Sequence, residues 1–150
     1  MLTLVEIPIS QRRDYLEFLL LADEQLEMVE KYMFQGKMYG LKFNQQVCAT
    51  CLIIPIKQNW LEIKNLAVLP TFQRQKLGSL LLKLCCQKYQ SKAKWVYVGT
   101  GESPITLNFY SKCGFHYSHR LKNFFLDNYD HPIYEGNTQL IDMIYLKKQL

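Results

Sequence analysis

A polar loop between a strand and a helix is the part of this sequence best suited to chemistry. Residues 68–84 read VLPTFQRQKLGSLLLKL: a strand end, a proline, a polar run with one glycine, and leucines at helical spacing. A tight loop that enters a helix leaves several backbone N–H groups unpaired in one concavity, where the helix dipole also favours negative charge. The segment therefore predicts a cradle for a pyrophosphate group.

Two common phosphate-binding motifs do not fit this loop. A Walker loop needs a second glycine five residues before Gly78 and a lysine directly after it, and the sequence has neither. A dinucleotide-binding fingerprint needs GxGxxG, which the loop lacks. A strand-to-helix turn that binds no ligand is the remaining alternative.

Length and composition indicate one domain over residues 1–150. The 150 residues are 49% apolar and 21% charged, which suits a single compact domain with a sizeable core. The opening MLTLVEIPIS does not read as a secretory signal, and the apolar run at residues 16–22 is too short to span a bilayer. We expect a cytoplasmic protein that does not act at a membrane.

Charge and cysteine content narrow the partners further. The net charge of +5 favours an anionic ligand, but the basic residues are scattered, so we expect no nucleic-acid partner. Five cysteines in a chain without an export signal predict reduced thiols. Cys48 and Cys51 form a CxxC, but no second CxxC or histidine pair completes four zinc ligands, so we expect no metal site.

The hydrophobic pattern alternates strands and helices without a repeat or linker. Strands are expected at residues 2–8, 37–44, 45–56, 60–69, 95–101, 116–125 and 140–149. Helices are expected at residues 12–23, 24–35, 77–85 and 104–115, and residues 128–137 are expected to be irregular. This order predicts a mixed α/β sheet.

The polar loop resembles a motif of the GNAT family of N-acetyltransferases. The family pattern is a strand ending in V-x-P, followed by Q/R-x-x-G-x-G/A at the start of a leucine-rich helix. Val68 and Pro70 match the first part. Gln73, Lys76 and Gly78 fall on the three diagnostic positions, with a lysine in place of the first glycine.

The segment NFYSKCGF at residues 108–115 and the order of the elements extend this resemblance to nearly the whole chain. The resemblance implies a single-domain GNAT-like α/β fold with a mixed sheet of about seven strands and about four flanking helices. It further implies that the sheet is splayed between its fourth and fifth strands.

The resemblance also implies acetyl-CoA as the cosubstrate. Backbone N–H groups of the loop would hold the pyrophosphate, and the loop residues are Gln73, Arg74, Gln75, Lys76, Leu77, Gly78 and Ser79. The exposed backbone of Ala67 and Val68 would pair with the amides of pantetheine as an added strand does. Ser103 stands where the family often has asparagine and can still donate a hydrogen bond. Lys76 is tolerable if its backbone is right-handed helical, and its ammonium group adds attraction for an anion.

Two residues are implied as catalysts by their positions in the family pattern. Tyr110 would protonate the departing thiolate, and Glu62 would draw a proton from the amine through water. Each also has a structural alternative, since Tyr110 suits a packed aromatic and Glu62 suits a surface pair with Lys64. Asp142 is the other acid of interest, either hydrogen-bonded for structure or lining the acceptor pocket.

The segment between the last two expected strands borders the acceptor cleft in this family. Its aromatic and acidic side chains suit an amine with hydrophobic character, and they are Phe124, Phe125, Asp127, Tyr129, Asp130 and Glu135. A loop packed by its own aromatics is an equal alternative, and His131 is expected as a turn residue.

The sequence as a whole predicts direct transfer of acetyl to a primary amine of a small molecule or peptide. An acyl-enzyme on Cys113 is a second route to the same product. A non-catalytic acyl-CoA-binding or regulatory module on the same fold is the alternative function. Family members often pair through their C-terminal strands, so a homodimer is also open.

Overall fold

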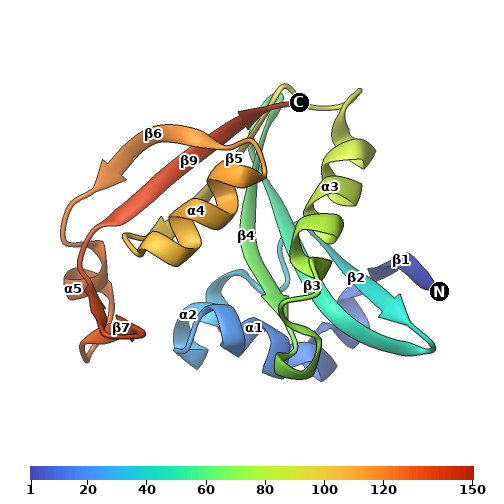
Figure 1. Cartoon of the computed structure of the whole chain (residues 1–150), viewed down its shortest axis with the longest axis horizontal. Coiled ribbons are helices and arrows are strands. Elements are labelled where there is room, and N and C mark those ends of the chain that lie inside the picture. The colour runs from blue at the N-terminus through green and yellow to red at the C-terminus, as the bar shows by residue number, and fades with distance from the viewer.

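The structure is a computed structural model that describes residues 1–150, and its centre is a seven-stranded sheet (Figure 1). The strands of this sheet are β1 (Leu2–Ile7), β2 (Lys37–Phe43), β3 (Gln46–Lys57), β4 (Trp60–Val68), β5 (Trp95–Gly101), β6 (His116–Leu121) and β9 (Met143–Gln149). They lie in the order β1-β2-β3-β4-β5-β9-β6. Only β4 and β5 are parallel, so the predicted mixed sheet is confirmed.

Helices cover both faces of this sheet. The chain has five α-helices and two short 3₁₀ segments, namely η1 (Ile9–Tyr15), α1 (Leu16–Ala22), α2 (Leu26–Tyr32), η2 (Pro70–Phe72), α3 (Leu77–Tyr89), α4 (Pro104–Lys112) and α5 (Phe124–Asn128). On β3, Leu52 packs with α1 and α2, whereas Cys51 and Ile53 pack in the larger cluster with α3. Because strand side chains alternate between faces, α1 and α2 lie opposite α3 and α4. None of the helices is both long and apolar enough to cross a membrane.

The parallel pair at the centre of the sheet is short. β4 and β5 pair only from Trp60–Ile63 to Trp95–Val98. Beyond these residues β4 continues along β3 as far as Val68, and β5 continues along β9 as far as Gly101. The two strands therefore separate toward the end that carries the polar loop, as the resemblance implied.

A β-bulge in β4 changes which side chains face α1. The register with β3 shifts between Leu52 and Ile53, so that Lys64 has no partner of its own. Ile63 packs in the cluster with α3, yet Asn65 donates a hydrogen bond to Leu19 O of α1. A bulge reverses the facing of every later side chain, so residues beyond Lys64 alternate in the opposite sense.

Two expectations about the elements between β5 and β9 need correction. The expected strand at 116–125 ends at Leu121, since Asn123 adopts a left-handed backbone with φ of 59° and begins α5. Phe125 of this helix is buried against Ile133 and Leu140. The expected irregular segment contains β7 (Ile133–Glu135), which forms a hairpin with β8 (Thr138–Leu140).

The expected helix at 12–23 is divided, because its first part is the 3₁₀ segment η1. The side chain of Arg12, within η1, is buried. Its guanidinium nitrogens donate to the carbonyl oxygens of Met33, Gln35 and Gly36 at 2.7–3.0 Å. These bonds tie η1 to the segment between α2 and β2.

Candidate active site

A cleft of about 650 Å³ opens where β4 and β5 separate. Its floor comes from residues 62–66 of β4 and 98–101 of β5, and α4 adds Thr106 and Tyr110. Its walls come from the ends of α1 and α2 on one side and from α5 and β7 on the other. The cleft therefore gathers residues from almost the full length of the chain.

The edge of β4 presents free backbone groups to this gap. The N–H of Leu69 donates to Cys48 O of β3 at 2.9 Å. Backbone groups alternate in direction along a strand, so Val68 and Leu66 point away from β3, whereas Ala67 points toward it. Leu66 lines the cleft and Ala67 does not. Leu66 and Val68, rather than Ala67, are therefore placed to pair with an extended ligand.

The polar loop after β4 contains two residues with left-handed backbones. Arg74 and Lys76 both have φ of 63°, so the condition under which lysine would be tolerated without strain at position 76 is not met. Such a backbone costs a non-glycine residue about 1 kcal/mol or more. The side chain of Gln73 donates from Nε2 to Val68 O at 3.0 Å, which ties the loop to the strand. Residues 73–76 are exposed, and Leu77 is buried in the core.

The N-terminus of α3 is open to an anion. No side chain caps it, and no acidic residue lies in its first turn. The Ser79 hydroxyl donates to Lys76 O at 3.1 Å rather than to a group outside the helix. A methyl group on Gly78 would meet Phe109 and Val68 at 3.5 Å, an ordinary contact, so packing within the protein does not require glycine there. The free N–H groups and the missing Cβ fit close approach by a phosphate.

Tyr110 is both a packed aromatic and a residue of the cleft. It is 7% exposed, and its ring lies edge-on to Phe109 and Phe115 at 5.0 and 5.5 Å between centroids. Its hydroxyl forms no hydrogen bond with another side chain, unlike the hydroxyls of Tyr32, Tyr39 and Tyr129. Burial raises the pKa of Tyr110 well above its usual value, so the hydroxyl keeps its proton at neutral pH.

Ser103 precedes α4 and is almost fully buried. Its side chain makes no capping bond to the helix, although its carbonyl accepts from Leu107 N at 2.9 Å. The hydroxyl is therefore not committed to the helix. Its contact with a cosubstrate stays a prediction.

Glu62 lies on the floor of the cleft, on β4 before the bulge. Its side chain is 14% exposed, and its Oε2 lies 3.9 Å from Lys64 Nζ. Burial raises the pKa of Glu62 and the charge of Lys64 partly opposes that rise. The expected pairing with Lys64 is thus present, but in a partly buried carboxylate that faces the cleft.

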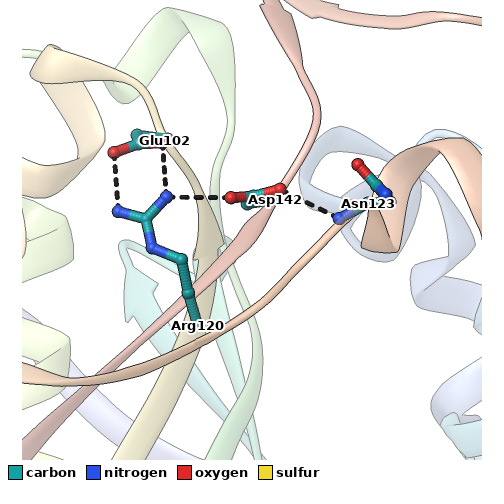
Figure 2. Close-up of polar contacts among 4 residues, drawn as sticks. All are labelled: Glu102, Arg120, Asn123 and Asp142. Carbon is teal, nitrogen blue, oxygen red and sulfur yellow. Dashed lines mark hydrogen bonds and ion pairs between the residues drawn. The ribbon is translucent and has the colours of Figure 1, made fainter.

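Asp142 is committed to a structural network outside the cleft (Figure 2). Its oxygens accept from Asn123 N at 2.9 Å and from Arg120 Nη1 at 2.8 Å. These donors lower the pKa of Asp142. Arg120 also holds Glu102 through two bonds of 3.1–3.2 Å. Of the two alternatives for Asp142, the structural one holds, and the network fixes the start of α5.

The segment after β6 contributes only part of its predicted set to the cleft. The residues that line it are Phe124, Phe125, Tyr129 and Glu135, and those that do not are Asp127 and Asp130. Glu135 accepts a hydrogen bond from Thr106. His131 contacts Asp130 at 2.5 Å and Glu24 at 3.3 Å, so it links this segment to the end of α1.

The sequence analysis missed a hydrogen-bonded group in the cleft, which consists of Asp23, Tyr32 and Asn65. Asp23 accepts from Tyr32 Oη at 3.2 Å and from Tyr129 Oη at 2.9 Å, and Asn65 Nδ2 donates to Tyr32 Oη at 3.0 Å. No motif marks these residues. Asp23 and Tyr129 are 106 positions apart in the chain, so only the fold brings them together.

The chain matches the sequence model of a known protein family. The sequence model of the acetyltransferase (GNAT) domain matches residues 35–117, more than half of the chain. The chain belongs to the GNAT acetyltransferase family. A GNAT acetyltransferase of Elizabethkingia anophelis with acetyl-CoA bound is 36% identical, with a TM-score of 0.92 over 99% of this chain and 98% of that one.

Two further relatives agree with this GNAT assignment. A Bacillus subtilis acetyltransferase in complex with CoA is 30% identical, with a TM-score of 0.86 over 99% of this chain and 97% of that one. The uncharacterized N-acetyltransferase YvbK of Bacillus subtilis is 29% identical over 95% of this chain and 93% of that protein. The protein is thus an N-acetyltransferase, as the motifs predicted.

The left-handed backbone at Lys76 of this GNAT domain gives a stability prediction. Lys76→Gly should have a free energy of unfolding about 1 kcal/mol above that of Lys76→Ala, because alanine keeps the backbone strain and glycine relieves it. Both variants remove the ammonium group, so charge does not differ between them. Urea denaturation followed by circular dichroism measures the difference. A Lys76→Ala protein as stable as Lys76→Gly would contradict the assigned strain.

Proposed function

We propose that this GNAT N-acetyltransferase transfers an acetyl group from acetyl-CoA directly to a primary amine of a small molecule or peptide. The observation that carries the proposal is the single cleft that joins the free edge of β4, the buried Tyr110 and the partly buried Glu62. Bound acetyl-CoA would supply an acyl thioester that an amine can attack. The relatives with acetyl-CoA and CoA bound support this cosubstrate.

In this proposal the chain holds the cosubstrate largely by its backbone. The free N–H groups at the start of α3, from Leu77 to Ser79, would bind the pyrophosphate. The groups of Leu66 and Val68 that face the gap would pair with the pantetheine amides. Because Val68 O already accepts from Gln73, the N–H of Val68 and both groups of Leu66 are the atoms available.

Glu62 would accept the proton that the amine must lose. Burial raises the pKa of Glu62, and a carboxylate with a raised pKa is a stronger base than an ordinary glutamate. The amine nitrogen bonds to the acyl carbon as the carbon–sulfur bond breaks. One proton leaves the nitrogen for Glu62, directly or through water, and the sulfur leaves as a thiolate that takes up a proton.

Tyr110 would stabilise the sulfur as it departs. A thiol has a usual pKa of about 8.5, below even an ordinary tyrosine at about 10. Since burial raises the pKa of Tyr110 further, its best role is a hydrogen-bond donor that lowers the energy of the developing thiolate.

Direct transfer is favoured over an acyl-enzyme on Cys113. This thiol is not among the residues that line the cleft. Burial raises the pKa of Cys113, and Lys148 only partly opposes the rise. The group is therefore a neutral thiol near pH 7, and the thiolate is the reactive form.

Release of CoA across a panel of amines tests the proposed activity. We expect turnover with at least one member of a panel of alkylamines, polyamines, amino acids, aminoglycosides and peptides. Tyr110→Phe should lower kcat about 100-fold with little change in the KM for acetyl-CoA, because the hydroxyl acts mainly on the departing sulfur. Tyr117→Phe, at an exposed tyrosine of β6, is the matched control.

Two outcomes would count against the proposal in different ways. Calorimetric binding of acetyl-CoA without turnover of any amine would favour the non-catalytic module. Full turnover by Tyr110→Phe would remove the tyrosine from the mechanism and leave the activity itself in place.

The pH dependence of turnover tests the base. Glu62 works in its ionised form and burial raises its pKa, so activity should fall with decreasing pH at a point above the ordinary glutamate value of 4.5. Glu62→Gln should lower kcat/KM and remove this acidic limb. Rate measurements across the pH range give both quantities. If the acidic limb were unchanged in Glu62→Gln, the base would be water or another group rather than Glu62.

Asp142→Asn is the matched control for Glu62→Gln, since its carboxylate lies outside the cleft. The acidic limb should persist in this variant. The pKa of Asp142 is lowered in the folded protein, so its stabilising effect is present above the ordinary value of 3.8 and is lost as the pH falls below it. Asp142→Asn should therefore have a lower Tm at neutral pH, and the difference from wild type should shrink in acid.

A further inference from the structure

The carboxylate of Asp23 lines the cleft without a cationic partner. Its Oδ2 accepts from Tyr32 Oη at 3.2 Å, and its Oδ1 accepts from Tyr129 Oη at 2.9 Å and from the backbone N–H of Gln25 at 3.5 Å. None of the ion pairs in the protein includes Asp23. Neutral donors alone, two hydroxyls and one backbone N–H, therefore hold a carboxylate that lines the cleft.

The hydrogen bonds around Asp23 all run toward it. Asn65 Nδ2 donates to Leu19 O at 2.9 Å, and a carbonyl oxygen can only accept, so the orientation of the amide is fixed. The same Nδ2 donates to Tyr32 Oη at 3.0 Å, which leaves the tyrosine proton for Asp23. Burial, followed by the charge of Asp23, raises the pKa of both Tyr32 and Tyr129, so both remain protonated donors.

Asn65 leaves one acceptor unused beside this carboxylate. Asn65 is 4% exposed and lines the cleft, and its Oδ1 is buried without a hydrogen-bond partner. A buried acceptor without a partner is destabilising, and a ligand that supplies a donor removes that cost. Asn65 and Asp23 both contact the hydroxyl of Tyr32, so one ligand group with several N–H donors can serve both.

The charges around the cleft favour a cation as that ligand group. Four acidic side chains line it against two lysines, whereas the chain as a whole carries +5. The acidic residues are Asp23, Glu24, Glu62 and Glu135, and the lysines are Lys31 and Lys64. Lys64 Nζ lies 3.9 Å from Glu62 Oε2 and 5.3 Å from the ring centroid of Tyr32, and Lys31 Nζ contacts Met28. Neither lysine forms an ion pair with Asp23.

Aromatic rings make the wall beside Asp23 suitable for an apolar body. Phe125 and Tyr129 are stacked with 5.7 Å between centroids, and both line the cleft with Tyr32. Such rings pack against an alkyl chain and attract a cation at its end.

We propose that Asp23 and Asn65 form a second cation-binding subsite, and that the acceptor is an amine with another cationic group on an aliphatic body. The amine that is acetylated lies at Glu62 and Tyr110, and the second cation donates to Asp23 and to Asn65 Oδ1. This inference rests on the proposed function. It narrows the proposed acceptor from a primary amine to an amine that carries a second cationic group.

A comparison of α,ω-diaminoalkanes with monoalkylamines of the same chain length tests the subsite. The wild-type protein should have a higher kcat/KM for the diamine of the best pair. Asp23→Asn should lower kcat/KM for that diamine roughly 10–100-fold, mainly through KM, because a hydrogen bond to a charged group is lost. The rate with the matching monoamine should change little.

Three controls separate this role from a structural one. Asp23→Glu keeps the charge and should recover part of the preference for the diamine. Asp127→Asn makes the same acid-to-amide change at an exposed residue of α5 outside the cleft and should keep the full preference. Thermal melting and acetyl-CoA affinity of Asp23→Asn report whether the fold and the cosubstrate site survive.

Binding measurements make the test independent of turnover. Calorimetry with the same amine pairs, on protein saturated with CoA, should give tighter binding of the diamine to wild type and loss of that difference in Asp23→Asn. Equal affinities for diamine and monoamine in wild type, or an equal loss for both in Asp23→Asn, would overturn the subsite. Failure to acetylate any amine, with the diamine preference in binding intact, would instead overturn the proposed function.

Discussion

The short parallel contact between β4 and β5 is the constraint on which the rest of this structure depends. At the end where the two strands pair, the ring centroid of Trp60 lies 6.2 Å from that of Trp95 and 4.9 Å from that of Tyr97. Lys57 Nζ lies 4.0 Å from the ring centroid of Trp60. At the other end each strand is held by its antiparallel partner, β4 by β3 and β5 by β9. Each of these ladders uses the outer edge of its strand, so the facing edges of β4 beyond Ile63 and of β5 beyond Val98 are left unpaired. Both the unpaired edge of β4 and the cleft beside it follow from this arrangement.

The bulge at Lys64 decides which side chains that gap receives. In a regular strand, residues three apart face opposite sides, so Glu62 and Asn65 would be separated by the sheet. The extra residue puts Asn65 on the same face of the sheet as Glu62, and it lets Asn65 reach α1 and Tyr32. A strand pattern read from sequence carries no mark of this shift, because WLEIKNLAV reads equally well as an unbroken strand. Sequence periodicity therefore could not predict which face of the sheet the side chains beyond Lys64 occupy.

Local sequence patterns predicted the elements well where the residue types of a turn or a helix end determine the structure. The turn at residues 44–45 has the left-handed backbone expected of a tight hairpin, and α4 starts at Pro104 and ends before Gly114. The polar loop was located correctly, but its sequence did not reveal the backbone conformation of Lys76, since the residue adopts a left-handed turn before α3 that lysine does not prefer. The network around Asp23 was beyond prediction for another reason. It joins four elements through side chains, and no local rule relates Asp23 to Tyr129.

The part of the protein that suits an anion and the part that suits a cation are separate, and this separation fits the proposed reaction. The chain carries a net charge of +5, which raises the local concentration of an anionic cosubstrate. The open N-terminus of α3 has no acidic residue in its first turn and lies outside the lining of the cleft. The cleft, in contrast, has twice as many acidic as basic side chains, and the one ion pair of Lys64 is with Glu62. A phosphate and an ammonium group therefore meet different local fields, although the splay of one pair of strands places both sites along the same edge.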